Sequence, residues 1–225
     1  MKKYLSITIV SILAFGVPSM ANAQIFVTAD IGGVPAVSGA TLENFDEPTP
    51  PSILTLSGNA YLVTGINYGV QYAPPYLSGS TAALFGESPQ NGLDNSLYVA
   101  VEVGGSATLS FSTPQHYFGL LWGTVDSNNC LTFYDSANSV IGTVLGANLP
   151  ANTGLLIDGP SWGPNETGYV NIISTTAFSR VVATYNGNSF EFDDVAYAQV
   201  VPEPASLSLL AFGLFGITLL RRRQR

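Results

Sequence analysis

Hydrophobic and polar residues alternate over short segments along most of the chain, which is the period of β-strands rather than of helices. The clearest case is 106–112, Ser-Ala-Thr-Leu-Ser-Phe-Ser, in which every second residue is apolar. A second β-rich run covers 97–103. The Gly104-Gly105 pair between the two runs predicts that they form a hairpin.

Turn residues separate many further runs of this kind. A second hairpin is predicted across Asn186-Gly187, between strands at 180–185 and 189–197. Residues 64–95 are rich in Gly, Pro and Ser, and we expect long loops there. No stretch combines a helical period with caps over a dozen residues. About ten or eleven short strands therefore predict an all-β antiparallel sandwich of the jelly-roll kind, with an open barrel as the alternative. The other strand-like runs are 118–122, 131–134, 140–144 and 169–173.

The first 23 residues have the layout of a secretory signal peptide. Lys2 and Lys3 precede an apolar stretch from Leu5 to Val17, and Ala21-Asn22-Ala23 is a small-residue cleavage site. We expect cleavage between Ala23 and Gln24, after export by the Sec machinery. The mature domain, 24–201, would then lie outside the cytoplasm.

The C-terminal end predicts a membrane anchor. Residues 205–220 carry no charge, and four arginines follow within 221–225. A helix of this length spans roughly 24 Å, slightly less than the hydrocarbon core of a bilayer. The arginine cluster favours a transmembrane helix with its basic end in the cytoplasm over the alternative, a buried core helix.

The order of these C-terminal features resembles the PEP-CTERM sorting signal. Val201-Pro202-Glu203-Pro204 is followed by the apolar run and then by the arginines, so the signal covers 202–225. The resemblance implies processing near Pro202, Glu203 and Pro204 by an exosortase, a membrane cysteine protease. It also implies an inner-membrane-anchored intermediate, later found at the cell surface or outside the cell, in bacteria that make exopolysaccharide and biofilm.

Three segments of the domain also resemble a group of exosortase-dependent surface proteins of unassigned activity. They are 117–126, 131–135 and 190–195. These motifs are strand-like, so the resemblance implies a β-sandwich but does not point to any enzymatic reaction.

Charge narrows the possible partners. One arginine against 14 acidic residues leaves the domain 24–201 with a net charge of −13. Binding to nucleic acid needs cationic contacts with phosphate, so a domain of this charge argues against nucleic acid as a partner. The same charge opposes docking on anionic lipid and favours solubility and divalent cations.

The sequence offers little for catalysis. Residues 159–163 fit the G-x-S-x-G spacing of a hydrolase nucleophile, but Pro164 follows at once where a helix should begin. His116, the single histidine, precedes the serine, so the hydrolase order of Ser, acid and His is impossible. A lone histidine without a second one or a nearby cysteine does not build a usual zinc site. We therefore expect that the protein is not an enzyme, and a secreted hydrolase ranks third among the possible functions.

The acidic residues suggest a structural Ca²⁺. Phe190-Glu-Phe-Asp-Asp-Val195 reads as the last strand, where alternation puts Asp194 on the face of the two phenylalanines. A buried carboxylate needs a partner, and calcium accepts carboxylate and carbonyl oxygens. First and last strands often pair in sandwiches, so Glu43 and Asp46 could join Asp193 and Asp194. The alternative is that all four are solvated at strand ends.

The predicted loop region contains three tyrosines, Tyr68, Tyr72 and Tyr76. Rings on loops can stack on sugars, although they can equally pack a loop onto the sandwich. The sequence thus predicts a cell-surface protein with a structural or adhesive role in exopolysaccharide or biofilm. A carbohydrate-binding-module-like protein with structural calcium is the alternative.

Overall fold

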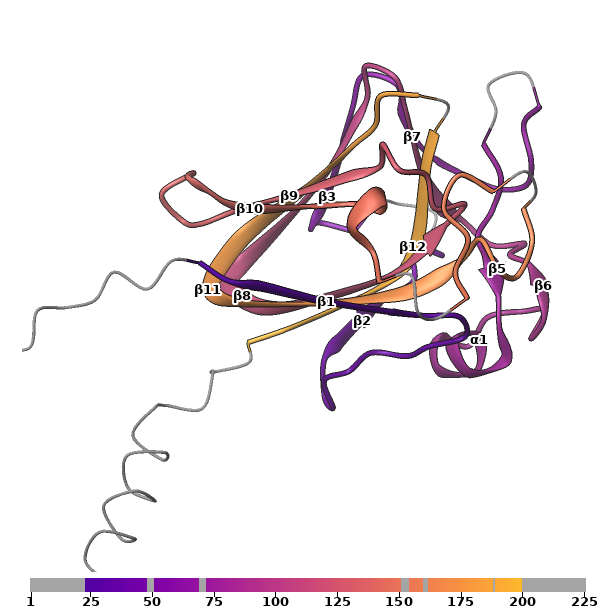
Figure 1. Ribbon diagram of the computed structural model, residues 1–225, viewed down its shortest axis with the longest axis horizontal. Helices are drawn as coiled ribbons and strands as arrows, with labels where there is room; N and C mark the ends of the chain where they lie inside the picture. The colour runs from indigo at the N-terminus through magenta and orange to yellow at the C-terminus, as the bar shows by residue number, and fades with distance from the viewer. Residues whose placement is uncertain are drawn as a thin grey trace, which may run out of the picture.

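The computed structural model describes residues 23–47, 51–68, 72–150, 154–159, 162–187 and 189–199. They form an antiparallel β-sandwich with one short α-helix (Figure 1). In chain order the elements are β1 (Ile25–Asp30), β2 (Thr41–Glu43), β3 (Leu54–Ser57), β4 (Ala60–Val63), β5 (Tyr76–Leu77), α1 (Gly79–Phe85), β6 (Gly92–Leu93), β7 (Tyr98–Glu102), β8 (Ser106–Gly123), β9 (Cys130–Tyr134), β10 (Val140–Leu145), β11 (Gly168–Thr184) and β12 (Ser189–Ala198).

Two long strands, β8 and β11, bend and take part in both layers of the sandwich (Figure 1). Their mutual pairing shifts register on both sides of the Phe178–Gln115 pair, which marks the bend. On one side of it, β11 and β8 pair with β1 and β12, and β12 extends that layer to β7, β4 and β2. On the other side, β11 and β8 pair with β9 and β3, and β10 forms the edge. Hydrogen bonding is therefore continuous between the layers.

The core between the layers is aromatic. Phe133 and Phe178 meet edge to face with ring centroids 5.1 Å apart, and Trp122 stacks on Phe190 at 4.6 Å. Each of these four side chains is fully buried. In 106–112 the side chains of every second residue from Ala107 are buried, which confirms the alternation predicted for this strand.

Both predicted hairpins are wrong. β7 pairs with β4 and β12 but not with β8, and β11 does not pair with β12. The turns at Gly104-Gly105 and Asn186-Gly187 instead carry the chain from one layer to the other. Turn residues specify a local reversal, whereas the partner of each strand is chosen by which apolar face has to be buried.

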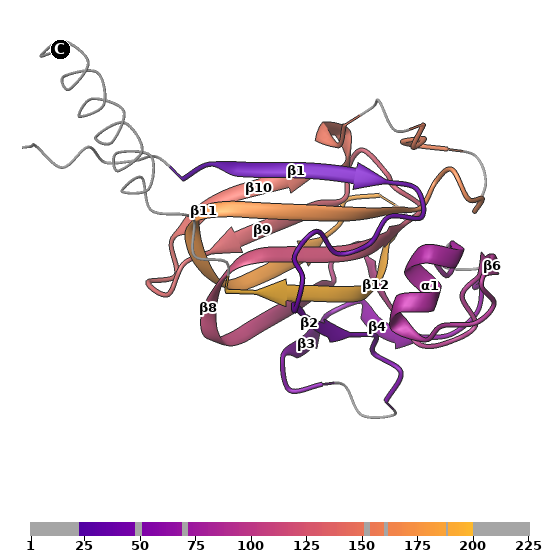
Figure 2. The same ribbon diagram turned by 90° about the horizontal axis from the view of Figure 1, so that it is seen from below.

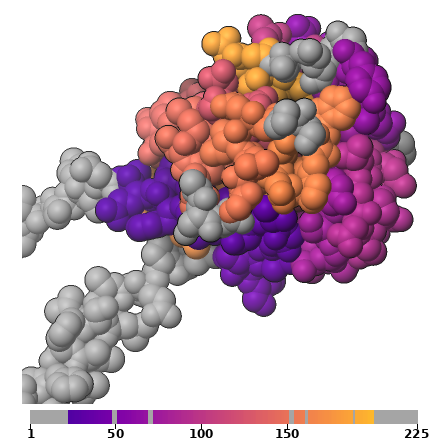
Figure 3. Space-filling view, turned by 45° about the vertical axis from the view of Figure 1, so that its right-hand side comes forward, coloured from indigo at the N-terminus to yellow at the C-terminus, as the bar shows by residue number. Residues whose placement is uncertain are grey.

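The segment predicted as loops contains more structure than expected. Here we call residues 72–97 the insert, since they connect β4 to β7 across α1 and the β5–β6 pair. The insert lies at one end of the sandwich (Figure 2). In the space-filling view its magenta surface adjoins the indigo N-terminal part of the domain (Figure 3). Leu77, Ala82 and Phe85 of the insert pack against Leu121 and Tyr169 of the sandwich.

No helix among the described residues is long and apolar enough to cross a membrane. The predicted span 205–220, the sorting motif and residues 1–22 of the signal peptide lie outside the described residues. Gln24, at the predicted start of the mature chain, is bonded to Thr175 through both its backbone N–H and its carbonyl oxygen.

Candidate functional site

The last strand carries an irregularity that buries two adjacent aspartates. Along one edge, β12 pairs with β7 as far as Phe192 and with β2 from Val195 onward. Its pairing with β8 is interrupted over the same residues, and Asp194 has a φ of 51°. Such a bulge breaks the alternation of side chains. The strict alternation predicted for 190–195 therefore does not hold, and Asp193 and Asp194 are both fully buried.

Three further acids lie near this bulge, and each comes from a segment next to the end of a strand or helix. Asp46 follows the end of β2, and Asp94 precedes the start of β7. Glu87 follows α1, whose C-terminal cap is Gly86 in the left-handed conformation. The backbone N–H of Glu87 donates to the Ala82 carbonyl oxygen at 2.8 Å. We call the five side chains the carboxylate cluster: Asp46, Glu87, Asp94, Asp193 and Asp194.

Hydrogen bonds fix part of the carboxylate cluster. The side-chain amide of Asn44 donates to Asp46 Oδ2 at 2.9 Å and to Glu87 Oε1 at 3.2 Å. Oδ1 of Asp94 accepts from the backbone N–H of Ser96 at 2.8 Å and from its hydroxyl at 2.5 Å. The Asn44 amide thus holds two carboxylates from separate segments, Asp46 and Glu87, beside each other.

Four buried oxygens of the carboxylate cluster accept no hydrogen bond from any residue that the structure describes. They are Oδ2 of Asp94, Oδ2 of Asp193 and both side-chain oxygens of Asp194. Asp193 and Asp194 are 0 % exposed, Asp94 3 % and Glu87 4 %. Burial of a carboxylate without compensation costs several kcal/mol or shifts its ionisation.

The ionisation equilibria respond to this burial. Loss of hydration, with the charges of Asp94 and Asp46 added, raises the pKa of Glu87 to about 7. Loss of hydration, with Glu87, Asp94 and Asp46 nearby, raises the pKa of Asp194 to about 9. The pKa of Asp193 is also raised well above its usual range, first by burial and then by Asp194 and Asp94.

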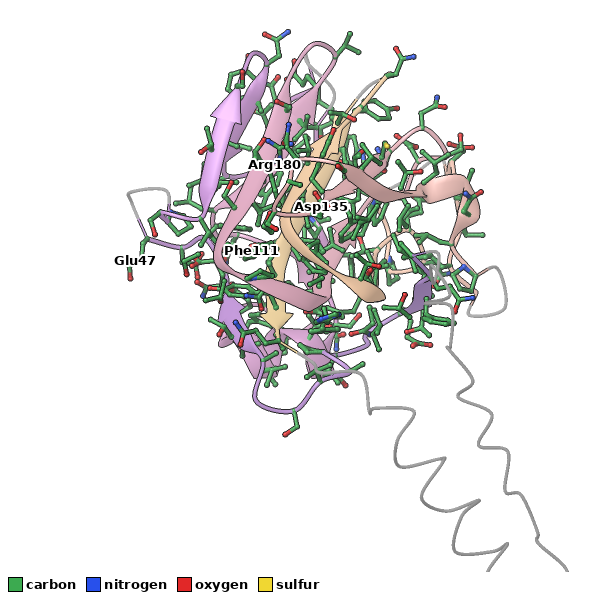
Figure 4. All side chains as sticks on the ribbon, turned by 90° about the vertical axis from the view of Figure 1, so that its left-hand side faces the viewer. Glu47, Phe111, Asp135 and Arg180 are labelled. Carbon is green, nitrogen blue, oxygen red and sulfur yellow. The ribbon has the colours of Figure 1, made fainter. Side chains whose placement is uncertain are left out.

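No basic side chain of the described residues compensates these charges. Arg180 is the single Lys or Arg of the domain, and its guanidinium lies 4.2 Å above the Tyr134 ring and donates to Asn138. Figure 4 shows Arg180 on a different part of the domain from Glu47, the neighbour of Asp46. His116 is also engaged elsewhere, with Nδ1 2.8 Å from the Ser174 carbonyl oxygen.

The structure brings together three of the four residues predicted to hold calcium. β2 pairs with β12 as expected, and Asp46 joins Asp193 and Asp194. The side chain of Glu43 is engaged elsewhere: Oε1 accepts from the N–H of Phe45 at 3.0 Å, and its charge acts on Tyr197. Glu87 and Asp94 were not predicted, because they lie in the Gly/Pro/Ser-rich segment. The excess of acids over bases was the one signal that pointed to them.

The three tyrosines predicted to bind sugar do not form one platform. Tyr68 is 75 % exposed and lies 5.3 Å from the Trp162 ring, measured between centroids. Tyr72 packs edge-on against the buried Tyr98, which fits the alternative that it fastens the loop. Tyr76 lies in β5, and its N–H donates to Oγ1 of Thr167 at 3.0 Å.

A polar groove of about 570 Å³ lies where the loop 37–41 meets the bend of β8 and the end of β12. None of the described residues that line it is charged. The Tyr197 ring is held 4.8 Å from Phe111, and its hydroxyl makes no hydrogen bond to another described residue. Burial, and secondly Glu43, raises the pKa of Tyr197, so the hydroxyl stays a donor. The polar side chains of the groove are Ser38, Thr41, Ser112, Thr113, Gln115, Tyr197 and Gln199.

Residues 200–224 match the family model described as the PEP-CTERM protein-sorting motif. The chain carries a PEP-CTERM sorting signal. The match confirms the predicted recognition of an exosortase-sorted protein, and it indicates export to the cell surface. No curated protein sequence matches the chain.

Solved structures with a related arrangement of strands have little sequence in common with this chain. A family 6 carbohydrate-binding module is 15 % identical, with a TM-score of 0.38 over 71 % of this chain and 94 % of the module. The K2 cleaved adhesin domain of Lys-gingipain is 10 % identical, with a TM-score of 0.41 over 73 % and 100 %. The catalytic domain of a GH87 α-1,3-glucanase is 11 % identical, with a TM-score of 0.39 over 72 % and 28 %. Similarities at this level carry no information about a ligand.

Proposed function

We propose that the chain is an exosortase-sorted surface protein with an adhesive role in the extracellular matrix. Its jelly-roll-like sandwich would bind neutral glycan in the polar groove. The observation that carries the proposal is an uncharged groove in a domain with 14 acidic residues and one arginine.

The lining suits a hydroxyl-rich ligand. Hydroxyl and amide groups can both donate to and accept from sugar hydroxyls. The Tyr197 ring packs against Phe111 and brings to the groove a hydroxyl that bonds to no other described residue. A volume of about 570 Å³ is within the usual range of ligand sites. The anionic surroundings would repel acidic polysaccharides, which makes a neutral glycan the favoured partner.

Binding of neutral oligosaccharides to the purified full chain tests the proposal. Cello-, malto- and laminarihexaose serve as neutral probes, oligoalginate as the anionic one, and isothermal titration as the measurement. We expect affinity for at least one neutral probe and none for oligoalginate. Tyr197→Phe should weaken binding roughly threefold to tenfold, because one hydrogen bond contributes about 1 kcal/mol. Ser112→Trp, at an exposed lining position, should abolish binding by filling the groove.

The control is Tyr61→Phe, which removes a hydroxyl from an exposed tyrosine of β4 outside the groove. It should leave affinity unchanged. Binding that survives Ser112→Trp and disappears in Tyr68→Ala would place the glycan on the Tyr68–Trp162 pair and would overturn the assignment to the groove.

A further inference from the structure

We propose that the carboxylate cluster binds a divalent cation of the calcium type, and that this cation fastens the insert to the sandwich. The cluster combines acids from three parts of the chain. Glu87 and Asp94 belong to the insert, Asp193 and Asp194 to the bulge of β12, and Asp46 to the segment after β2.

The first reason is that no described side chain supplies a positive partner for the buried carboxylates. Four of the five carboxylates are at least nine-tenths buried, and three of these have oxygens without a donor. Asp194 is the extreme case, since both of its side-chain oxygens are buried and accept no hydrogen bond from any described residue. A bound cation supplies the positive charge that no lysine or arginine supplies here.

Protons alone leave the arrangement incomplete. A proton can neutralise Asp194 but brings it no hydrogen-bonding partner, because both of its side-chain oxygens are buried and accept nothing from the described residues. The charges of Glu87, Asp94 and Asp46 all act on Asp194, so carboxylates of the insert and of the segment after β2 lie near it. A cation at this place would be coordinated by Asp194 together with these neighbours.

The ligand chemistry favours calcium over zinc. All five side chains offer oxygen only, and calcium takes six to eight oxygens in a flexible geometry, whereas zinc favours nitrogen and sulfur. Among the described residues, no three acidic, histidine or cysteine side chains already surround one point. The carboxylates therefore have to rotate toward the ion. Calcium tolerates this more readily than magnesium, which demands near-octahedral coordination at shorter distances.

The position of the ligands gives the cation a mechanical role. Apart from the ligands, the insert is held by the contacts of Leu77, Ala82 and Phe85 with Leu121 and Tyr169, and by backbone and side-chain hydrogen bonds. A cation shared by Glu87, Asp94 and Asp194 would join the far end of α1 and the approach to β7 directly to β12. Removing the ion should therefore release the insert before the sandwich unfolds.

Calcium itself is the probe in the test, with the full chain treated with EGTA and then titrated. We expect calcium binding in isothermal titration, with dissociation constants in the range of extracellular sites, about 10⁻⁴–10⁻³ M. At a hundredfold excess of calcium over the dissociation constant, the melting temperature should rise by about 5–10 °C. Limited proteolysis in EGTA should cut within 72–97 and should be suppressed by calcium. Magnesium at the same concentration should protect less.

Isosteric variants separate the metal site from a purely protonated cluster. Asp194→Asn and Glu87→Gln remove charge without changing shape, and they should lower calcium affinity at least tenfold while the chain stays folded. Two control variants should bind calcium as the unaltered chain does. They are Glu47→Gln, at the exposed neighbour of Asp46, and Glu43→Gln, whose carboxylate accepts from the Phe45 N–H. Equal melting temperatures in EGTA and in calcium, or undiminished calcium binding by Asp194→Asn, would overturn the proposal.

Discussion

The hydroxyl of Tyr169 donates a hydrogen bond of 3.1 Å to the backbone carbonyl oxygen of Asp194, and both residues are fully buried. Tyr169 lies at the start of β11, and Asp194 occupies the left-handed conformation within the bulge of β12. The bond therefore joins two strands that do not pair with each other and satisfies a carbonyl that the bulge removes from the regular ladder.

Tyr169→Phe should destabilise the domain by about 1–3 kcal/mol, because it leaves this buried carbonyl without a donor. Urea unfolding of the full chain, followed by circular dichroism, measures the effect. Tyr61→Phe is the matched control, since Tyr61 is 41 % exposed, and it should change stability by less than about 0.5 kcal/mol. Equal effects of the two substitutions would mean that the bond to Asp194 contributes nothing.

Asn129 should be among the most sensitive polar positions. Its side-chain oxygen accepts from Trp122 Nε1 at 2.8 Å and from the Asp126 N–H at 2.9 Å, and its amide donates to the Ser189 carbonyl at 3.2 Å. Asn129→Ala leaves the buried indole N–H without an acceptor, so we expect a loss of about 2–4 kcal/mol. Unfolding followed by tryptophan fluorescence measures it.

The preceding residue supplies the control for Asn129. Asn128 is exposed, and Asn128→Ala makes the same chemical change without touching the indole. We expect it to be neutral within about 0.5 kcal/mol. A loss of stability as large in Asn128→Ala would show that the turn, rather than the bond to Trp122, is responsible.

Sequence patterns predicted the strands better than their partners. The faces of 106–112 follow directly from alternation, because the buried and exposed sides of a strand are a local property. The Gly104-Gly105 and Asn186-Gly187 turns were predicted to close hairpins, yet each connects strands of different layers. Which strand lies beside β7 depends on residues far away in the chain, and local turn chemistry contains no such information.

The members of the carboxylate cluster, too, could be predicted from the sequence only in part. Asp193 and Asp194 could be predicted because they directly follow core aromatics in a strand. Glu87 and Asp94 could not, because they arrive through the fold of the insert. Alternation also missed that the bulge buries both aspartates. Such an irregularity depends on the change of neighbour from β7 to β2, which no local pattern records.

Stability should fall as pH rises when calcium is absent. Burial raises the pKa of Glu191 to about 8, that of Asp194 to about 9 and that of Glu87 to about 7. Between their ordinary values near 4 and these raised values, the folded chain binds more protons than the unfolded chain. The stabilisation is complete below about pH 4 and is lost as pH rises through 7 to 9.

Melting temperatures in EGTA at pH 5, 7 and 9 measure this dependence, and we expect a steady decline. In excess calcium the decline should be smaller, because the cation replaces the protons of the carboxylate cluster. Glu191→Gln should also flatten the profile, since this residue is buried apart from the cluster and accepts from Ser189 and from the Ala73 N–H. Stability that increases from pH 5 to pH 9 in EGTA would contradict the raised pKa values.

The turn at Gly58, between β3 and β4, packs against the turn at Gly104-Gly105, and each connects the two layers. Substitution of two glycines tests this contact. Gly58 has a φ of 62°, and a Cβ there would lie 2.2 Å from the carbonyl oxygen of Gly104. Gly39 has a similar φ of 76°, but a Cβ there would meet nothing within 4 Å. Both substitutions to alanine cost about 1 kcal/mol in backbone strain. Gly58→Ala should cost about 2–3 kcal/mol more, because backbone atoms of the neighbouring turn have to move. Urea midpoints of the two variants give the difference directly, and equal losses would mean that the turns separate without penalty.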